Sequence, residues 1–302
     1  MYLLAFPLAA QQAKAYYLSC IERFSKKKYS AALKFINKAI SIDSVNAQYY
    51  YQRALIDSWL NKGEKFYDDI NHSILLDSNF IEAYLLRASR LDLDGYPSNA
   101  ILDFGRAINV AKEDSLKCLA FVGRGRCKCE MKDYKGAYLD FQTAISLDSN
   151  QAAAFVGMGV ALDKCDRPNE AIVYYLKGFS KDTTDVTALV NLCFVYGKIG
   201  DYKRAMEYGN KSIAKNPEVG GGYNNRGYAK YKLGDLSGAL RDINKSLRYL
   251  PGNSYAYRNR ALVYIQQKKF KEACKDLQSA LHFRFATEYG DEVFELQDKY
   301  CK

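Results

Sequence analysis

The sequence predicts an all-α solenoid of eight tandem helix–turn–helix repeats, and three observations support this fold class. Small residues recur with a period of 34 residues, each period contains two apolar stretches at helical spacing, and turn or stop signals separate the stretches. Counted from position 1, the repeats begin at residues 13, 47, 81, 118, 152, 186, 220 and 254. A repeat array needs no division into globular domains, because each repeat packs only on its neighbours.

Three positions of the repeat hold small residues. Position 8 holds Cys20, Ala54, Ala88, Gly125, Gly159, Cys193, Gly227 and Ala261, and position 27 holds Ala39, Ser73, Ala107, Ala144, Gly178, Ser212, Ser246 and Ala280. Position 20 is alanine in every repeat except the second, where it is Phe66. Helices approach closely only where side chains are short, so these positions mark the crossing of the two helices.

The helices follow in a fixed order along each repeat. Positions 2–14 predict the first helix, a break such as Lys232–Asp235 follows, and the second helix ends at a stop such as Asn216-Pro217. The array covers residues 13–287. Three inserted residues near Glu113–Ser115 are expected to lengthen the loop between the third and fourth repeats.

The segment Tyr223-Asn-Asn-Arg-Gly-Tyr-Ala-Lys-Tyr-Lys-Leu-Gly-Asp235, with the small residues at positions 8, 20 and 27, resembles the tetratricopeptide repeat (TPR) family. Proline stands at the expected position 32 only at Pro217 and Pro251, which is a departure from that pattern. The resemblance extends over all eight repeats. It implies a right-handed superhelix of tandem repeats whose first helices line a concave groove. Such arrays usually bind other chains and are not enzymes.

The resemblance also implies that positions 2, 5, 9, 12 and 13 face this groove. The expected partner-binding residues are Tyr17, Ile21, Phe24, Tyr51, Leu55, Trp59, Val156, Val160, Phe194, Tyr228, Tyr231, Arg258, Leu262 and Ile265. Rigid aromatic side chains dominate binding energy in protein interfaces, so this stripe favours a protein or peptide partner. The alternative is that some of these side chains pack against the next helix.

Positions 7 and 23 vary together within the chain. Five repeats carry arginine at position 7 with aspartate at position 23, and the other three carry neither. The pairs are Arg53 with Asp69, Arg87 with Asp103, Arg124 with Asp140, Arg226 with Asp242, and Arg260 with Asp276. We expect a partly buried structural ion pair that joins the two helices of one repeat, because the arginine fork suits a carboxylate. The alternative is charged residues on solvated helix faces.

The net charge of +10 is unevenly distributed. Residues 186–302 contain twenty Lys and Arg against twelve Asp and Glu, a net charge of +8, whereas residues 47–117 contain eight against eleven, a net charge of −3. The leading interpretation is a non-enzymatic scaffold that binds a segment of a partner protein in the groove. The alternative is a basic module that docks on nucleic acid or on an anionic membrane or envelope surface. Nucleic acid is disfavoured, because the acidic block would interrupt a continuous track of phosphate contacts.

The sequence contains no motif that predicts catalysis, a cofactor or a metal. It lacks a glycine-rich phosphate loop, a Ser/His/Asp set and a Cys/His pairing. Cys127 and Cys129 have no second cysteine pair at zinc-like spacing, and the two histidines lie far from them in sequence. We therefore expect no catalytic residues, no metal site and no cofactor.

Residues 1–12 form an apolar segment that is too short to span a membrane. It resembles the core and cleavage region of a secretory signal peptide without its basic leader, which favours a secreted or periplasmic location. The alternative is a hydrophobic turn that caps the first repeat of a cytoplasmic protein.

Residues 288–302 are expected to form a C-terminal helix that caps the last repeat, with Val293 and Leu296 on one face. This helix would lie where the first helix of a ninth repeat would lie, which brings Cys301 toward Cys274 of the preceding helix. These two cysteines would form a disulfide in an oxidising compartment and remain thiols in a reducing one. The alternative is two unrelated cysteines near a frayed end.

Overall fold

The computed structural model describes residues 5–301, which form eighteen α-helices in tandem and, within that range, no β-strand. The chain divides into two compact units, Met1–Ser149 and Asn150–Lys302. The prediction of an all-α solenoid is confirmed, with two helices for each of the eight repeats and two more after the last.

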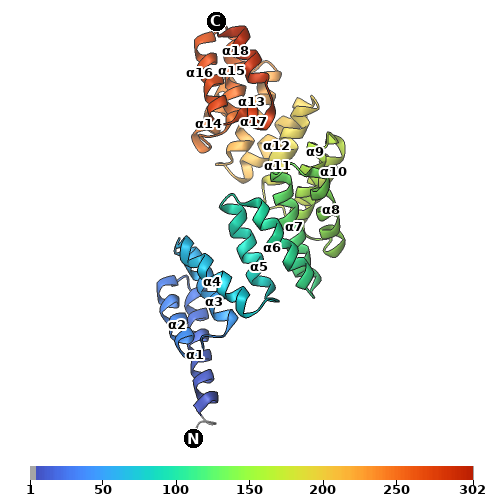
Figure 1. The fold of residues 1–302 in the computed structure, drawn as a ribbon. Coiled ribbons are helices and arrows are strands. Elements are labelled where there is room, and N and C mark those ends of the chain that lie inside the picture. Colours follow the sequence, from blue (N-terminus) through green and yellow to red (C-terminus); the bar gives the residue numbers. More distant parts are fainter. Residues whose placement is uncertain (1–4, 302) are drawn as a thin grey trace. The chain divides into compact units, whose positions relative to one another are not determined.

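The first compact unit contains the helices of repeats 1 to 4, and the two helices of each repeat pack against each other (Figure 1). These are α1 (Ala5–Ser25), α2 (Tyr29–Ile42), α3 (Ala47–Trp59), α4 (Gly63–Leu76), α5 (Ile81–Leu93), α6 (Pro97–Val110), α7 (Asp114–Glu130) and α8 (Tyr134–Leu147).

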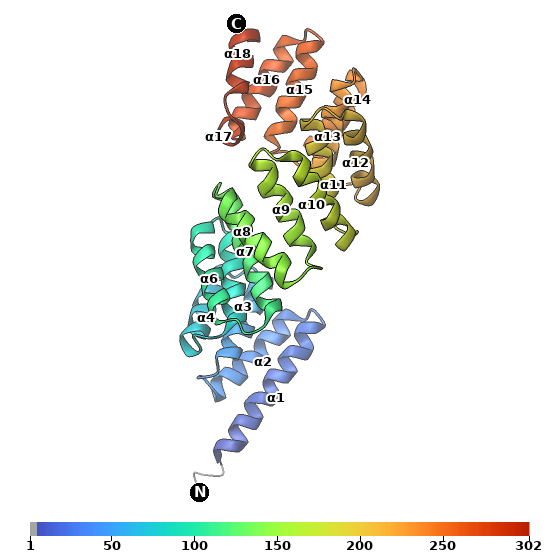
Figure 2. The ribbon, with the colours of Figure 1, turned by 90° about the vertical axis from the view of Figure 1, so that its right-hand side faces the viewer.

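The second compact unit contains repeats 5 to 8 and the C-terminal helices, of which α18 packs on α16 (Figure 2). Its helices are α9 (Ala152–Lys164), α10 (Pro168–Lys181), α11 (Thr187–Lys198), α12 (Tyr202–Lys215), α13 (Gly220–Lys232), α14 (Leu236–Tyr249), α15 (Ser254–Gln266), α16 (Phe270–His282), α17 (Phe285–Tyr289) and α18 (Glu292–Tyr300).

The turn between the two helices of a repeat has the same backbone shape in all eight repeats. Position 15 has a positive φ every time, at Lys27, Asn61, Gly95, Lys132, Asp166, Gly200, Gly234 and Lys268. Only three of these residues are glycine, the residue that adopts this conformation without a steric penalty. The geometry of the repeat therefore imposes a left-handed backbone conformation at position 15, even where the residue there disfavours it. In three repeats an aspartate then caps the second helix, as Asp235 does by accepting a hydrogen bond from the Gly238 N–H.

The small positions lie where the two helices cross. A Cβ added at Gly227 would lie 2.7 Å from the side chain of Ile243 and 3.3 Å from the carbonyl oxygen of Ala239, so only a glycine fits this crossing without movement of its neighbours. Alanines at positions 8, 20 and 27 are fully buried in several repeats, and in the second repeat Phe66 is fully buried against Ala54. The hydrophobic core therefore includes separate small clusters at the crossings of repeats 1, 2, 3, 7 and 8.

The insertion before the fourth repeat differs from expectation. The connection between α6 and α7 is short, and α7 instead has 17 residues where α3, α5 and α9 have 13 each. The inserted residues supply the first turn of α7, where the carboxylate of Asp114 suits the positive end of the helix dipole. The expectation of a longer loop was wrong.

The two ends of the chain also have defined helices. Residues 1–4 of the apolar N-terminal segment lie outside the described residues, and α1 begins at Ala5. At the other end, the expected C-terminal helix is divided into α17 and α18 by Gly290, whose φ is +88°. Val293 and Phe285 are buried against Ala261, Ala273 and Leu277 of the last repeat, with Leu296 packed beside them.

Candidate functional site: the helix crossings and the groove

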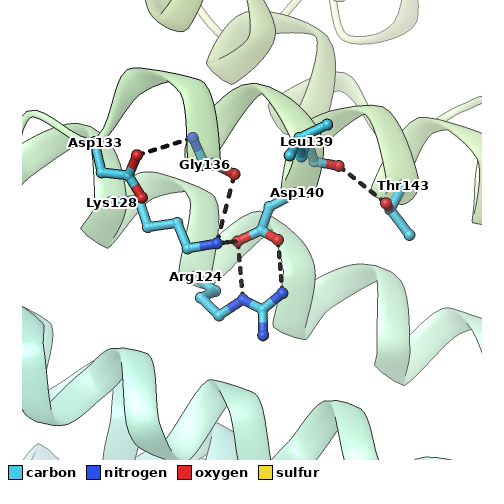
Figure 3. Close-up of polar contacts among 7 residues, drawn as sticks. All are labelled: Arg124, Lys128, Asp133, Gly136, Leu139, Asp140 and Thr143. Carbon is cyan, nitrogen blue, oxygen red and sulfur yellow. Dashed lines mark hydrogen bonds and ion pairs between the residues drawn. The ribbon is translucent and has the colours of Figure 1, made fainter.

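The structure brings together all five arginine–aspartate pairs. In each pair the arginine Nε and Nη2 donate to the two oxygens of the aspartate at distances of 2.6 to 2.8 Å. Figure 3 shows one example, in which Arg124 of α7 faces Asp140 of α8. The aspartates are buried and the arginines keep partial contact with water. Each pair thus links the first and second helices of its own repeat.

Two further contacts at these crossings were missed by the sequence analysis. In four of the five repeats, the remaining arginine nitrogen, Nη1, donates to an asparagine at position 25 of the preceding repeat. The contacts are Arg53 to Asn37, Arg87 to Asn71, Arg226 to Asn210, and Arg260 to Asn244, at 2.6 to 3.0 Å. A comparison of position 7 with position 25 of the repeat before it would have revealed this link.

A lysine at position 11 supplies the second missed contact. Lys128 Nζ lies 2.8 Å from a carboxylate oxygen of Asp140, and Lys230 Nζ lies 2.8 Å from one of Asp242. Figure 3 shows Lys128 in contact with Asp140. In these two repeats the buried carboxylate therefore pairs with two cations from the first helix. Such a network is worth more than one isolated pair, because the aspartate oxygens are bonded on both sides.

The three repeats without the pair have an aromatic residue in place of the aspartate at position 23, namely Phe35, Tyr174 and Tyr208. In repeat 1 the guanidinium of Arg23 lies 4.0 Å from the ring centroid of Phe35. In repeat 6 the rings of Tyr196 and Tyr208 stack with centroids 5.4 Å apart, and Leu192 is fully buried.

Repeat 2 departs from the other charged crossings, because position 11 is the acid Asp57. Asp57 is 2 % exposed, and its Oδ1 has no hydrogen-bond partner, although Lys62 Nζ lies 3.5 Å away. Burial raises the pKa of Asp57, Lys62 opposes that shift, and Asp69 reinforces it. A carboxylate thus occupies the place of the lysine of repeats 4 and 7, beside a cavity of about 360 Å³ that Asp69, Lys65 and Asp57 help to line.

The expected groove residues of the first compact unit form aromatic contacts with their neighbours. Tyr17 lies 5.2 Å from Tyr49, and Tyr51 lies 5.0 Å from Phe80 between ring centroids. Phe24 and Trp59 both contact Tyr29 of α2, and Trp59 remains 62 % exposed. Ile21 and Leu55 are partly buried. These side chains both pack the array and present an apolar face.

In the second compact unit, three expected groove residues line one pocket of about 260 Å³. Phe194 of α11, Tyr228 of α13 and Arg258 of α15 meet there. The other lining residues are Cys193, Gly197, Lys198, Tyr202, Asn224, Asn225, Tyr255 and Asn259. The ring centroids of Tyr228 and Tyr202 are 6.5 Å apart, and those of Phe194 and Tyr255 are 5.9 Å apart.

The remaining groove residues of this unit, Val156, Val160, Tyr231, Leu262 and Ile265, do not line the pocket. Val156 instead packs against Gly178, while Tyr231 packs on the Ala239 core cluster and Ile265 on the Ala261 cluster.

Three asparagines form a hydrogen-bonded row across the floor of the pocket. Asn259 Nδ2 donates to Asn224 Oδ1 at 3.0 Å, and Asn224 Nδ2 donates to Asn225 Oδ1 at 3.1 Å. At its two ends, Arg258 Nη1 donates to Asn259 Oδ1 and Asn225 Nδ2 donates to the Val190 carbonyl oxygen. Each amide group has two N–H donors, and each uses one of them in this row. Asn224 and Asn259 are buried and Asn225 is partly buried, so the row places polar amide groups beside the aromatic walls of the pocket.

The two cations of the pocket already have acidic partners. Arg258 forms a bidentate ion pair with Glu292 of α18, with contacts of 2.6 to 3.0 Å. Lys198 lies 3.0 Å from the buried Asp163. The pocket is consequently polar and close to neutral, although the surrounding third of the chain is basic.

The structure places Cys274 and Cys301 in a disulfide with a Cα–Cα distance of 5.6 Å, which joins α16 to the end of α18.

Burial raises the pKa of the Cys20 thiol to about 11 and that of Cys193 to about 12, so neither is a reactive thiolate at neutral pH. Within residues 5–301 no group of three His, Cys, Asp or Glu side chains could hold a metal ion. No helix in this range is long and apolar enough to cross a membrane.

Comparisons with known proteins rest on structure alone, because no family model and no curated protein matches the sequence. A chain of the crystal structure of the APC/C hetero-tetramer Cut9–Hcn1 matches with a TM-score of 0.67 and 17 % identity. The match covers 88 % of this chain and 52 % of that one, so the chain spans about half the length of this neighbour.

Two bacterial structures match over most of their own length. PilF of Pseudomonas aeruginosa matches with a TM-score of 0.61 and 17 % identity, over 69 % of this chain and 94 % of that one. A tetratricopeptide repeat protein from Parabacteroides merdae matches with a TM-score of 0.57 and 15 % identity, over 95 % and 98 % of the two chains. Together with the tandem helical repeats, these neighbours show that the chain has the fold of the tetratricopeptide repeat proteins.

Proposed function

We propose that the chain is a non-enzymatic scaffold that binds a segment of another protein along its first helices, with the pocket between α11, α13 and α15 as a principal contact. The observation that carries this proposal is the asparagine row between aromatic walls, in which the partly buried Asn225 has a second N–H donor besides the one that it uses. A peptide backbone offers carbonyl acceptors at regular intervals, and an apolar side chain of the peptide would contact Phe194 and Tyr228. Aromatic contacts supply most of the binding energy in such sites.

The neutral character of the pocket favours a protein segment over a phosphate-rich ligand. Phosphate binding relies on cations that release counterions, whereas Arg258 and Lys198 are paired with Glu292 and Asp163. The alternative of a basic module that docks on nucleic acid or an anionic surface would need to use other lysines and arginines of residues 186–302. Salt dependence separates the two functions.

The test is a selection of binding peptides from a displayed library of protein segments, followed by affinity measurements on the intact chain. Tyr228→Ala should weaken binding of the selected peptide by roughly thirtyfold, as expected for loss of a central aromatic contact. Asn225→Ala should weaken it by roughly tenfold. Tyr228 is preferred to Tyr231 for this test, because Tyr231 packs on the Ala239 core cluster and its truncation would also disturb the fold.

Tyr96→Ala serves as the control, since Tyr96 is 59 % exposed and lies in the first compact unit. Its affinity for the peptide should equal that of the unmodified chain. Equal affinities for all variants would contradict the proposed groove. A steep loss of affinity between about 0.1 and 0.5 M salt would support the nucleic-acid or anionic-surface alternative instead.

A further inference from the structure

We propose that the chain pairs with a second copy of itself, through the acidic outer face of α18 in one copy and a lysine-rimmed cleft between α10 and α12 in the other. The cleft lies on the second helices of repeats 5 and 6, whereas the groove is lined by first helices. The inference therefore does not depend on the proposed groove function. Three observations carry it: the apolar cleft, the lysines at its rim and the composition of the exposed face of α18.

The cleft has a volume of about 530 Å³, within the range of about 300–1,000 Å³ that is typical of binding pockets. Its lining residues are Leu176, Phe179, Tyr208, Lys211, Ala214 and Lys215. Leu176 is 39 % exposed although it lies in the middle of α10. An exposed leucine beside partly buried aromatic rings forms an apolar surface that a partner would cover favourably.

The cleft exists because repeats 5 and 6 lack the charged crossing. Position 25 is Leu176 in repeat 5, where repeats 1, 2, 6 and 7 have the asparagine that accepts from the next arginine. Position 7 of repeat 6 is the buried Leu192, so no arginine approaches Leu176 from that helix. The polar link between neighbouring repeats is thus replaced by an apolar opening on the outer surface.

Lysines surround this apolar floor. Lys211 and Lys215 are lining residues of the cleft, and Lys215 Nζ lies 5.7 Å from the ring centroid of Phe179 and forms no ion pair with an acid among the described residues. Lys211 pairs only with Glu207, an exposed contact one helical turn away, which contributes little in water. The rim therefore offers two cations to an acidic partner.

The outer face of α18 has the complementary composition. Asp291, Phe294, Glu295 and Asp298 follow the spacing i, i+3, i+4 and i+7, which places them on one side of the helix. All four are exposed, and Phe294 is 47 % exposed, whereas the opposite side buries Val293 in the last repeat. None of the three acids forms an ion pair within residues 5–301.

An aromatic side chain flanked by three acids therefore matches an apolar cleft flanked by two lysines. Phe294 would enter the cleft over Leu176, while Glu295 and Asp298 would approach Lys211 and Lys215. In its own chain α18 packs on α16, so this contact requires a second molecule. Two copies related by a two-fold axis would make the contact twice, and a contact that does not close would give longer assemblies.

Sedimentation velocity over a concentration series tests this pairing on the full chain. At about 0.05 M salt we expect the sedimentation coefficient to rise with concentration toward a dimer or a larger assembly, and at about 0.5 M salt the association should weaken, because exposed charges are screened. Lys211→Glu/Lys215→Glu should weaken association at least tenfold, and so should Glu295→Lys/Asp298→Lys, since each places like charges across the contact. Phe294→Ala should weaken it without changing the net charge.

A mixture of the two charge-reversed variants tests whether the two surfaces contact each other directly. Each alone should remain monomeric, and the mixture should associate, because each cleft then meets an α18 of opposite charge. Lys268→Glu/Lys271→Glu is the matched control and should behave as the unmodified chain, with circular dichroism showing that every variant is folded. A chain that stays monomeric at low salt, or association that survives both charge reversals, would overturn the proposal.

Discussion

Repeats 6 and 7 belong to the same compact unit and have the same helix crossing, yet they fill it in opposite ways. Repeat 7 uses a charged set, in which Arg226 and Lys230 of α13 both contact the buried Asp242 of α14. Repeat 6 has Leu192, Tyr196 and Tyr208 at the same three positions, and the two tyrosine rings stack.

The comparison shows that the crossing tolerates either chemistry, provided that positions 7 and 23 change together; position 11 varies more freely, since repeats 3 and 8 keep the ion pair with Leu91 and Tyr264 there. A buried ion pair and a well-packed apolar set of similar volume can contribute similar net stability, because the attraction between the charges mainly offsets their desolvation. What differs is the connection to the preceding repeat. Arg226 reaches Asn210, whereas the apolar set leaves Leu176 exposed at the outer cleft.

The largest effect is expected from breaking the charged set on one side only. Asp242→Asn leaves Arg226 and Lys230 without their counterion in a largely buried site, so the free energy of unfolding should fall by roughly 3–5 kcal/mol. Thermal unfolding followed by circular dichroism measures this change.

Asp235→Asn is the matched control, because Asp235 is an exposed N-cap and asparagine caps a helix equally well. Its melting temperature should differ little from that of the unmodified chain. If both substitutions cost the same, the charged crossing has no special role in stability.

The next effect concerns the C-terminal end of the array, where α18 packs on repeat 8. Cys274→Ser removes the cross-link between α16 and α18, which closes a loop with a sequence separation of 27 residues. Compared with the oxidised unmodified chain, the variant should lose about 3 kcal/mol of stability or less. The reason is that the cross-link restricts the unfolded chain, and its removal gives back conformational entropy worth about that much free energy for a loop of this size. Cys165→Ser, at an exposed cysteine without a disulfide, should leave the melting temperature unchanged. Equal stability of the two variants under oxidising conditions would show that the bond does not hold the cap.

A smaller effect extends the comparison to repeat 2, where Asp57 occupies the position of Lys230. Asp57→Lys would place a cation beside Asp69, as in repeats 4 and 7, and should raise the free energy of unfolding by about 1 kcal/mol at neutral pH. Asp68→Lys makes the same charge change at an exposed side chain and should have a much smaller effect.

The advantage of Asp57→Lys should depend on pH with a defined sign. The pKa of Asp57 is raised in the folded chain, so its ionised form costs stability above that pKa, and protonation relieves the cost as the pH falls through it. The stability difference between the two proteins should therefore shrink on acidification. A difference that is constant with pH would show that the charge of Asp57 is not responsible.

The period, the helices and the five ion pairs could be predicted from the sequence, because one chain supplies eight internal comparisons. The link from Arg226 to Asn210 was missed, since it connects two repeats and the comparison was made within single repeats. The asparagine row of the groove pocket was missed as well: Asn225 and Asn259 stand at position 6, outside the positions that the resemblance assigned to the groove. The break at Gly290 depends on a backbone conformation that a helical pattern around Val293 does not reveal.

The most direct test of the account is a thermodynamic cycle between the two helices of repeat 7. One variant changes the first helix to the residues of repeat 6, Arg226→Leu/Lys230→Tyr, another changes the second helix, Asp242→Tyr, and a third combines them. Urea unfolding of the four proteins gives the coupling free energy. We predict that the combined variant is at least about 2 kcal/mol more stable than the sum of the separate losses would allow. Losses that add within about 0.5 kcal/mol would contradict the claim that the two helices of the crossing exchange their residues as a coupled set.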